Sequence, residues 1–90
     1  MTRAMAIDHA ADGVRINCVC PGPVETPLLE RIFADAADPE KERRRNIEKT
    51  IMKRLGRPEE IANVILFLSS EEASYMTGSI VVADGGLTAE

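Results

Sequence analysis

Aromatic side chains are scarce in this sequence, and positive charge is not in excess. Aromatics make up 3% of the residues, tryptophan is absent, and the net charge is −4. Proteins that bind single-stranded nucleic acid stack the bases on aromatic side chains, and a duplex partner requires a basic face. The composition therefore argues against a nucleic-acid partner, and we interpret the basic run Arg43-Arg44-Arg45, which has acids around it, as part of a solvated helix.

Long apolar runs are also missing. No stretch approaches the roughly 20 apolar residues that cross a bilayer. The first eight residues do not form a signal peptide, because their apolar stretch is short and Asp8 follows at once. We therefore expect no membrane association and a cytoplasmic location.

Potential metal ligands and thiols are few. Cys18 and Cys20 are the two cysteines and His9 is the one histidine. On a strand, residues two apart point to the same side, and along an extended backbone such a pair is unsuited to a relaxed disulfide. We expect two small buried side chains in a reducing compartment, a surface or packing role for His9, and no metal site, which would need more ligands.

Apolar residues make up 44% of the chain and charged residues 29%, as in a globular protein. Residues 2–11 favour a helix that Asp12-Gly13 closes. The β-branched, apolar stretches 14–20 and 79–83 predict strands, and Pro21-Gly22-Pro23 ends the first of them.

Three further segments have helical patterns. Thr26-Pro27 is a helix start, and it precedes an apolar face made of Leu28, Leu29, Ile32 and Phe33. Asp38-Pro39 breaks or restarts this helix before the charged stretch 40–53. Residues 58–68 predict a helix so apolar that it should be buried on more than one side.

The order helix, strand, helices, strand predicts a parallel βαβ unit with a right-handed crossover. Parallel sheets are covered on both faces, and two strands do not form an independent sheet. We therefore assign the chain to the α/β class, as part of a larger sheet.

The segment 17–27 holds the candidate site, because ligands of open α/β sheets bind beyond the carboxyl ends of the strands. Gly22 has no Cβ, so a flat ring could approach the backbone there. The backbone amide of Val24 and the hydroxyl of Thr26 are suited to hold a carboxamide. By spacing alone, an ordinary Pro-Gly turn with a threonine cap explains the same residues.

Four blocks of sequence resemble the short-chain dehydrogenase/reductase family, in order and at its spacing. The first is the helix end at 2–8, and the second is Val14-Arg15-Ile16-Asn17 followed by residues 21–27. The others are residues 55–62 with 67–78, and the terminal Val82-Ala83-Asp84-Gly85-Gly86. The resemblance implies that residues 1–90 form the C-terminal portion of one NAD(P)-binding domain with a Rossmann-type doubly wound parallel sheet.

The resemblance also implies roles for individual residues. The nicotinamide of NAD or NADP would lie against the loop, residues 27–53 would form a substrate lid, and Asn17 would order the strand. Tyr75, Thr77 and Gly78 would be structural. The implied cofactor-binding residues are Pro21, Gly22, Pro23, Val24 and Thr26, and the implied lid residues are Leu28, Leu29, Ile32 and Phe33.

Such a protein would transfer a hydride between NAD(P) and an alcohol, ketone or 3-oxoacyl-type substrate. The family's catalytic Tyr-x-x-x-Lys is not found, since Ser79 stands four residues after Tyr75, and no Gly-rich cofactor loop matches either. We therefore expect a fragment without catalytic residues of its own. The alternative is an inert family member that serves only as a remnant or as a subunit-interaction piece. The resemblance further implies a homodimer or homotetramer, formed through the late helices and the last strand.

Overall fold

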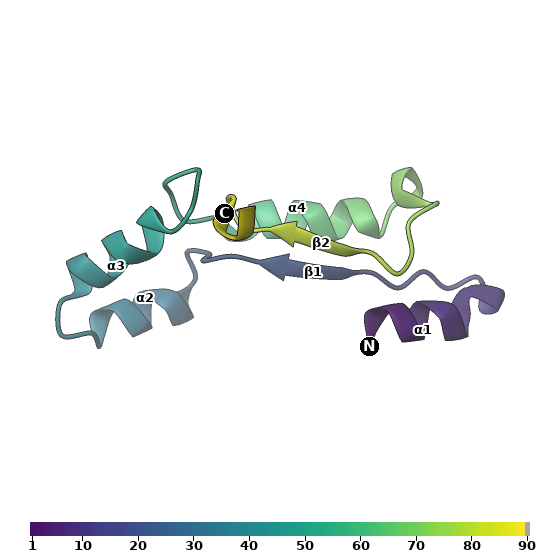
Figure 1. Cartoon of the computed structure of the whole chain (residues 1–90), viewed down its shortest axis with the longest axis horizontal. Coiled ribbons are helices and arrows are strands. Elements are labelled where there is room, and N and C mark those ends of the chain that lie inside the picture. Colours follow the sequence, from purple (N-terminus) through teal and green to yellow (C-terminus); the bar gives the residue numbers. More distant parts are fainter. Residues whose placement is uncertain (90) are drawn as a thin grey trace.

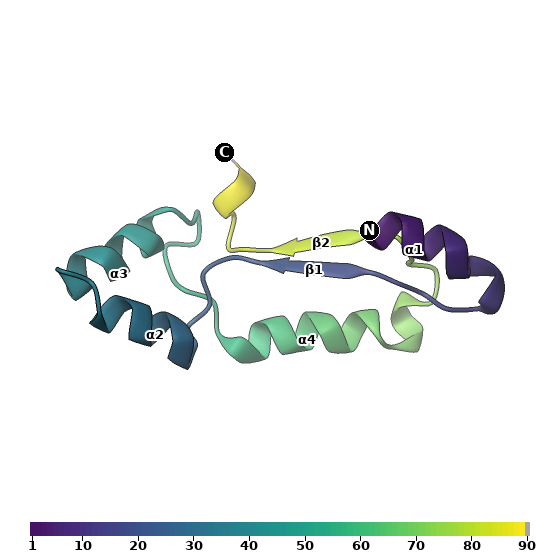
Figure 2. The ribbon, with the colours of Figure 1, turned by 90° about the horizontal axis from the view of Figure 1, so that it is seen from below.

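Two short parallel strands form the centre of the molecule. The computed structural model describes residues 1–89 of the chain, and in it β1 (Cys18–Pro21) pairs with β2 (Ile80–Ala83) in parallel. The helix α4 (Pro58–Leu68) lies along one face of this pair, as Figures 1 and 2 show. The predicted α/β class and parallel strand pair are confirmed.

The strand β1 starts later than predicted, because side chains replace the ladder over residues 14–17. Arg15 donates through Nη1 to the carbonyl of Ala73 at 2.8 Å and to that of Met76 at 3.2 Å. Asn17 donates to the Met76 carbonyl at 3.0 Å and accepts from the Ser79 amide at 3.0 Å. This stretch is therefore fixed to the loop before β2 without regular pairing.

The first helix follows the sequence pattern closely. α1 (Thr2–His9) continues as the 3-10 turn η1 (Ala10–Asp12), and Gly13 closes it with a left-handed φ of 75°. The prediction that this glycine caps the helix is confirmed. At the opposite end of the chain, η2 (Glu71–Ala73) and η3 (Leu87–Ala89) are single 3-10 turns.

A helical hairpin connects β1 to α4. α2 (Pro27–Ala34) is capped by Thr26, whose Oγ1 accepts from the Leu29 amide at 3.2 Å. α3 (Pro39–Glu48) restarts at Asp38, whose carboxylate accepts from the Lys41 amide at 3.2 Å. Each helix thus begins with a capping side chain and a proline, as expected.

The charged stretch does not stay helical to residue 53. α3 ends at Glu48, and Thr50 donates its hydroxyl to the Ile47 carbonyl at 2.9 Å. The chain then turns to pack on the segment after β2, where the Met52 amide donates to the Gly85 carbonyl at 3.0 Å. The helical pattern assigned to residues 40–53 is therefore wrong at its C-terminal end, because this tertiary contact competes with the helix.

The buried core is small for the length of the chain. The radius of gyration is 16.2 Å and the extents are 52 × 23 × 21 Å, whereas a compact 90-residue domain has a radius of gyration near ~12 Å. Leu66 of α4 is 69% exposed and Val82 of β2 is 52% exposed. The expectation that α4 is buried on more than one side is thus wrong for this chain, because one helix beside two strands covers only one face of each. The buried residues are Ala6, Phe33, Thr50, Leu55, Leu68 and Ala73.

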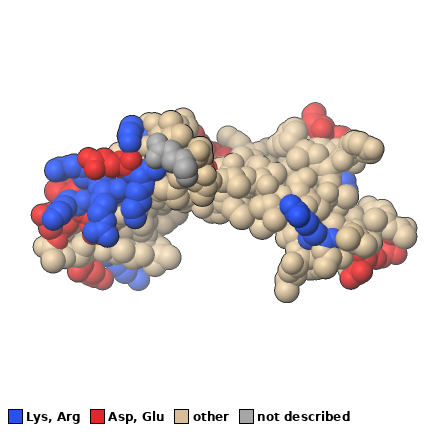
Figure 3. Space-filling model, viewed as in Figure 1, with Lys and Arg blue, Asp and Glu red and all other residues tan. Residues whose placement is uncertain are grey.

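Charge is distributed unevenly along the molecule. Figure 3 shows lysine, arginine and acidic side chains gathered over the α2–α3 end, while the middle of this face, over the strands, carries almost none. Among residues 1–89, no helix combines the length and the apolar character needed for a bilayer crossing.

Candidate functional site

The predicted cofactor loop begins where β1 ends, beside the turn that ends β2. Since the strands are parallel, both carboxyl ends lie at the same edge of the sheet. Pro21 is the last residue of β1, and Gly22 continues the ladder by donating its amide to the Ala83 carbonyl at 3.2 Å. A Cβ on Gly22 would lie 2.8 Å from both Cα and Cβ of Asp84. The missing Cβ therefore makes room for Asp84, a contact that the sequence did not indicate.

The backbone around Val24 is held by a second, isolated parallel bridge. The Gly56 amide donates to the Pro23 carbonyl at 2.9 Å, and the Glu25 amide donates to the Gly56 carbonyl at 2.8 Å. In such a bridge one residue makes both hydrogen bonds, here Gly56, and the residue opposite it, Val24, directs its own N–H away from the partner segment. Within residues 1–89 no acceptor is found for the Val24 N–H. This N–H is therefore a fixed donor available to a ligand.

Thr26 caps α2 and retains hydrogen-bonding capacity. One lone pair of Oγ1 accepts from the Leu29 amide at 3.2 Å. A hydroxyl carries one donor and two lone pairs, so its proton and its second lone pair remain for another partner. The capping interpretation and the ligand interpretation of Thr26 are therefore compatible.

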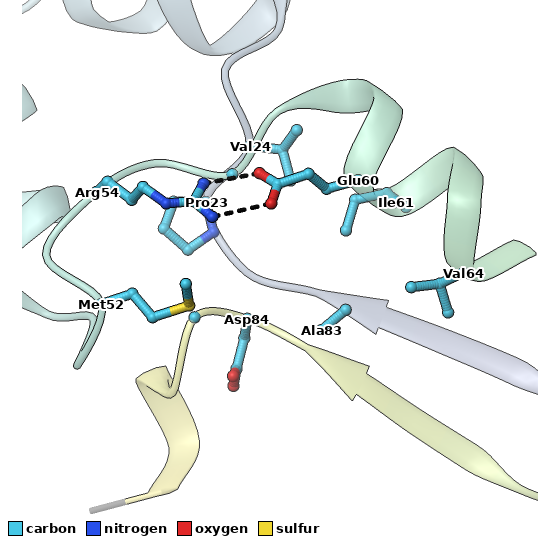
Figure 4. A pocket seen from close by; sticks show the side chains of 11 residues that line it. Pro23, Val24, Met52, Arg54, Glu60, Ile61, Val64, Ala83 and Asp84 are labelled. Carbon is cyan, nitrogen blue, oxygen red and sulfur yellow. Dashed lines mark hydrogen bonds and ion pairs between the residues drawn. The ribbon is translucent and has the colours of Figure 1, made fainter.

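A cavity of about 270 Å³ lies between the strand ends and the start of α4 (Figure 4). Its wall is mostly apolar, and the Arg54–Glu60 ion pair lies at its rim. Pro23 and Val24 of the predicted cofactor loop line it directly, so the cavity adjoins the candidate site. The other apolar side chains around it are Met52, Ile61, Val64 and Ala83.

The Arg54–Glu60 pair is a feature that sequence reasoning missed. Two guanidinium nitrogens of Arg54 donate to the two carboxylate oxygens of Glu60 at 2.7 and 2.8 Å. Glu60 also accepts from the Arg57 amide at 2.9 Å, which caps the start of α4. These bonds, with Arg54 contributing most, lower the pKa of Glu60 to about 2. The three-residue spacing from Arg57 to Glu60 is the signal that would have indicated the cap.

Asp84 organises the turn after β2. Its carboxylate accepts from the Thr88 hydroxyl at 2.7 Å and from the Gly86 amide at 2.9 Å. The Thr88 hydroxyl is the main reason why the pKa of Asp84 is lowered. Gly86 has a φ of 89°, and a Cβ there would lie 2.8 Å from that of Ile51. The turn therefore packs closely against both the predicted cofactor loop and the end of the predicted lid segment.

The predicted lid residues divide between two environments. Leu28 is 66% exposed and Ile32 is 53% exposed, and one helical turn separates them on the same face of α2. Phe33 is buried, and the Arg43 guanidinium lies 5.9 Å from the centre of its ring. Leu29 is half-buried. The structure thus leaves Leu28 and Ile32 as an apolar face and places Phe33 inside the hairpin.

Two arginines of the basic run on α3 pair with acids, in agreement with its interpretation as part of a solvated helix. Arg43 donates to Glu30 at 2.8 Å and to Glu25 at 3.0 Å, and Arg45 lies 3.6 Å from Glu42. The pairing raises the pKa of Arg43.

Asn17 and the residues near Tyr75 lie at the amino end of β1, opposite the predicted cofactor loop. The Thr77 hydroxyl accepts from the Ile16 amide at 3.1 Å, and the Gly78 amide donates to the Ile16 carbonyl at 2.7 Å. Asn17 bonds to Met76 and to Ser79, which lie on either side of these two residues. Tyr75 is fully exposed. Asn17, Thr77 and Gly78 therefore join the two strands at their start.

The cysteines are free, with Cys20 exposed and Cys18 half-buried, so the expected burial is wrong for Cys20. Their sulfurs are 4.0 Å apart, and the interaction raises the pKa of Cys20. His9 is exposed and lies 3.4 Å from Asp12. No group of three His, Cys, Asp or Glu side chains suited to a metal is found in the described part of the chain.

Comparison with known proteins yields one family. The family model described as enoyl-(acyl carrier protein) reductase matches residues 1–88. The uncharacterized oxidoreductase YxbG of Bacillus subtilis is 44% identical over 99% of this chain and 33% of its own length. The 3-oxoacyl-[acyl-carrier-protein] reductase FabG of Thermotoga maritima is 44% identical over 97% of this chain and 33% of its own length. The chain therefore spans about a third of the length of these curated relatives.

Solved structures agree with this result. A short chain dehydrogenase family protein from Francisella tularensis superposes with a TM-score of 0.94 at 33% identity, over 100% of this chain and 39% of its own. The aldohexose dehydrogenase of Thermoplasma acidophilum, in a C-terminal deletion mutant, gives a TM-score of 0.87 at 35% identity, over 99% and 40% of the two chains. These matches cover nearly every residue of this chain, in agreement with the four blocks of sequence and the parallel strand pair, and the chain belongs to the short-chain dehydrogenase/reductase family.

Proposed function

We propose that this chain supplies the nicotinamide-holding loop and the substrate lid of an NAD(P)-dependent oxidoreductase. The reaction would move a hydride between the nicotinamide and the substrate, either from the hydroxyl-bearing carbon of an alcohol or to the carbonyl carbon of a ketone or 3-oxoacyl-type substrate. The observation that carries the proposal is the pair of groups beyond the end of β1, where the free N–H of Val24 lies two residues before the hydroxyl of Thr26.

A nicotinamide carboxamide matches these groups in hydrogen-bonding type. The Val24 N–H donates to the carboxamide oxygen, and the remaining lone pair on Thr26 Oγ1 accepts from the carboxamide nitrogen. Two such bonds would fix which face of the ring meets the substrate. When bound, the nicotinamide supplies or accepts the hydride.

The α2–α3 hairpin is the proposed lid. It follows the loop directly, and the exposed side chains of Leu28 and Ile32 give it an apolar face. An apolar wall excludes water from a hydride transfer and favours a substrate with an apolar part. The relatives named for 3-oxoacyl and aldohexose chemistry act on carbonyl or alcohol carbons, which supports the reaction class but not one substrate.

A chimera tests the proposal. The third of the Thermotoga reductase that aligns with this chain is replaced by this chain, and NAD(P)H binding is followed by fluorescence. Val24→Pro removes the N–H but keeps the bridge, which uses the amides of Glu25 and Gly56. We expect about tenfold weaker NAD(P)H binding, as for one lost hydrogen bond.

Val24→Ala is the matched control, because it shortens the side chain and retains the N–H. The chimera with this change should bind NAD(P)H as tightly as the unchanged chimera. If the alanine and proline variants bind NAD(P)H equally tightly, the Val24 N–H does not contact the cofactor.

A second candidate function is that of a subunit-interaction piece without turnover. It is favoured by the exposed apolar side chains of α4 and β2, which include Leu66, Phe67 and Ile80. The same surfaces support a homodimer or homotetramer for the proposed oxidoreductase. The two candidate functions make different predictions for the chimera. Only the first predicts that the chimera oxidises NAD(P)H in the presence of a 3-oxoacyl substrate.

A further inference from the structure

The guanidinium of Arg43 is shared by two acids that belong to different segments. Its Nη2 donates to Glu25 at 3.0 Å and its Nη1 donates to Glu30 at 2.8 Å. Among residues 1–89, neither acid forms an ion pair with any other cation. Each carboxylate therefore depends on this one guanidinium for its ion pair.

Glu25 lies in the part of the loop that is proposed to hold the nicotinamide. It stands between Val24 and Thr26, and its amide donates to the Gly56 carbonyl at 2.8 Å. The ion pair with Arg43 restrains the side chain of the same residue. Because the Val24 N–H and the Thr26 hydroxyl lie one residue to either side, restraining Glu25 also restrains how these two groups face each other.

The α2–α3 hairpin in turn fixes the position of Arg43. The residue belongs to α3, its partner Glu30 belongs to α2, and its guanidinium lies 5.9 Å from the centre of the buried Phe33 ring. A guanidinium is planar, so its two donor nitrogens keep a fixed separation. The hairpin and the loop are therefore joined through one rigid group.

We propose that Arg43 is a positioning residue that acts on the nicotinamide through Glu25. This proposal rests on the proposed function of the loop. Arg43 itself contacts no part of the cofactor, and its ion pair holds the Val24 N–H and the Thr26 hydroxyl in the arrangement that a carboxamide requires. The affinity for NAD(P)H then depends on a side chain of the proposed lid, 18 positions beyond the loop residue that it holds.

The experiment uses the chimera and follows NAD(P)H binding by fluorescence. Arg43→Met keeps a long side chain against Phe33 and removes the charge. We expect binding to weaken about threefold to fivefold, the size expected for the loss of a partly exposed ion pair. Arg43→Lys keeps the charge and should bind NAD(P)H more tightly than Arg43→Met, although one nitrogen cannot hold both acids equally well. If lysine restores nothing, the charge of Arg43 has no positioning role.

A double-mutant cycle tests whether Arg43 acts through Glu25. Glu25→Gln should weaken binding as much as Arg43→Met, and the two changes together should weaken it no further. A long-range effect of charge on the anionic cofactor predicts opposite signs for these two variants, whereas the loss of a shared restraint predicts the same sign. Glu30→Gln is the matched control, because it leaves the Glu25 ion pair in place and should bind like the unchanged chimera. Effects that are additive, or opposite in sign, would overturn the proposal.

A second measurement needs no cofactor. Amide hydrogen exchange of residues 22–27 in the chimera should be faster with Arg43→Met or Glu25→Gln than with Glu30→Gln. Equal exchange in all three variants contradicts the restraint, whether or not NAD(P)H binds. If the unchanged chimera binds no NAD(P)H, the proposed function itself fails. If it binds and Arg43→Met binds equally tightly, only the positioning role fails.

Discussion

Arg43 ties α3 to Glu25, the residue between Val24 and Thr26. Its guanidinium donates to Glu25 at 3.0 Å and to Glu30 on α2 at 2.8 Å, while it lies over the ring of Phe33. One side chain of α3 thus contacts both α2 and the proposed cofactor loop. The position of the hairpin relative to the loop therefore depends on Arg43.

We expect Arg43→Ala to loosen the hairpin without unfolding the rest of the chain. The ion pairs are partly exposed, so each contributes at most about 1 kcal/mol and is weakened by salt. Amide hydrogen exchange should become a few-fold faster in α2 and α3. Arg44→Ala is the matched control, since Arg44 is exposed and has no ion pair among residues 1–89. Equal exchange in the two variants would contradict this role.

Gly22→Ala should destabilise the strand ends. The added Cβ would lie 2.8 Å from backbone and side-chain atoms of Asp84, so the two turns must separate. We expect a loss of about 1–3 kcal/mol, seen as a lower melting temperature of the chimera. The control is Gly56→Ala, where the nearest atom is 3.6 Å away and the melting temperature should change little. Equal melting temperatures of the two variants would contradict the close contact between Gly22 and Asp84.

Substitutions of Thr26 separate its capping role from its proposed cofactor role. Thr26→Gly removes the hydroxyl, and as a helix cap glycine costs only a few tenths of a kcal/mol. Thr26→Ser keeps both roles. In the chimera, we expect the glycine variant to bind NAD(P)H several-fold more weakly with little change in melting temperature. If both variants bind equally well, Thr26 is only a cap.

The Arg54–Glu60 pair predicts a pH dependence. The pKa of Glu60 is lowered from its ordinary value of 4.5 to about 2, so the charged carboxylate is favoured in the folded chain. Its contribution to stability is complete above about pH 4.5 and is lost as the pH falls through 2. An NMR titration of the Glu60 side chain should show this low midpoint. Arg54→Gln should raise the midpoint, and an unchanged midpoint would refute the ion pair.

The chain alone should self-associate. Side chains such as Leu66, Ile80 and Val82 are half or more exposed, and the strand pair has open edges. Sedimentation velocity should show species larger than a monomer. Leu66→Lys should reduce them, whereas Leu28→Lys, on the lid, should not. A sharp monomer that melts cooperatively would contradict the expectation.

Local signals predicted much of the fold. Thr26 and Asp38 cap helices where the sequence places them, Gly13 takes the left-handed conformation, and the apolar stretches pair in parallel. These features depend on a few neighbouring residues, so they can be recognised without knowing the rest of the structure. The four blocks led to the correct family for the same reason.

Contacts between distant residues were not predictable in this way. The helix was expected to reach residue 53, but the Met52 amide bonds to Gly85, which lies 33 positions later. The contacts of Gly22 with Asp84 and of Phe33 with Arg43 also join residues that are distant in the sequence, so the sequence pattern does not reveal them. The cofactor-binding residues therefore stay predictions, although their backbone positions are now described.

The proposed lid segment is attached to the rest of the chain at both ends. Directly before it, the Glu25 amide donates to the Gly56 carbonyl at 2.8 Å, and near its end the Met52 amide donates to the Gly85 carbonyl at 3.0 Å. A segment held at both ends cannot move like a free chain end, so we expect any opening motion of the proposed lid to rotate the hairpin about a line through its two attachment points. Shortening or lengthening the turn between α2 and α3 should consequently change how far the proposed lid extends, while its two attachment points stay in place.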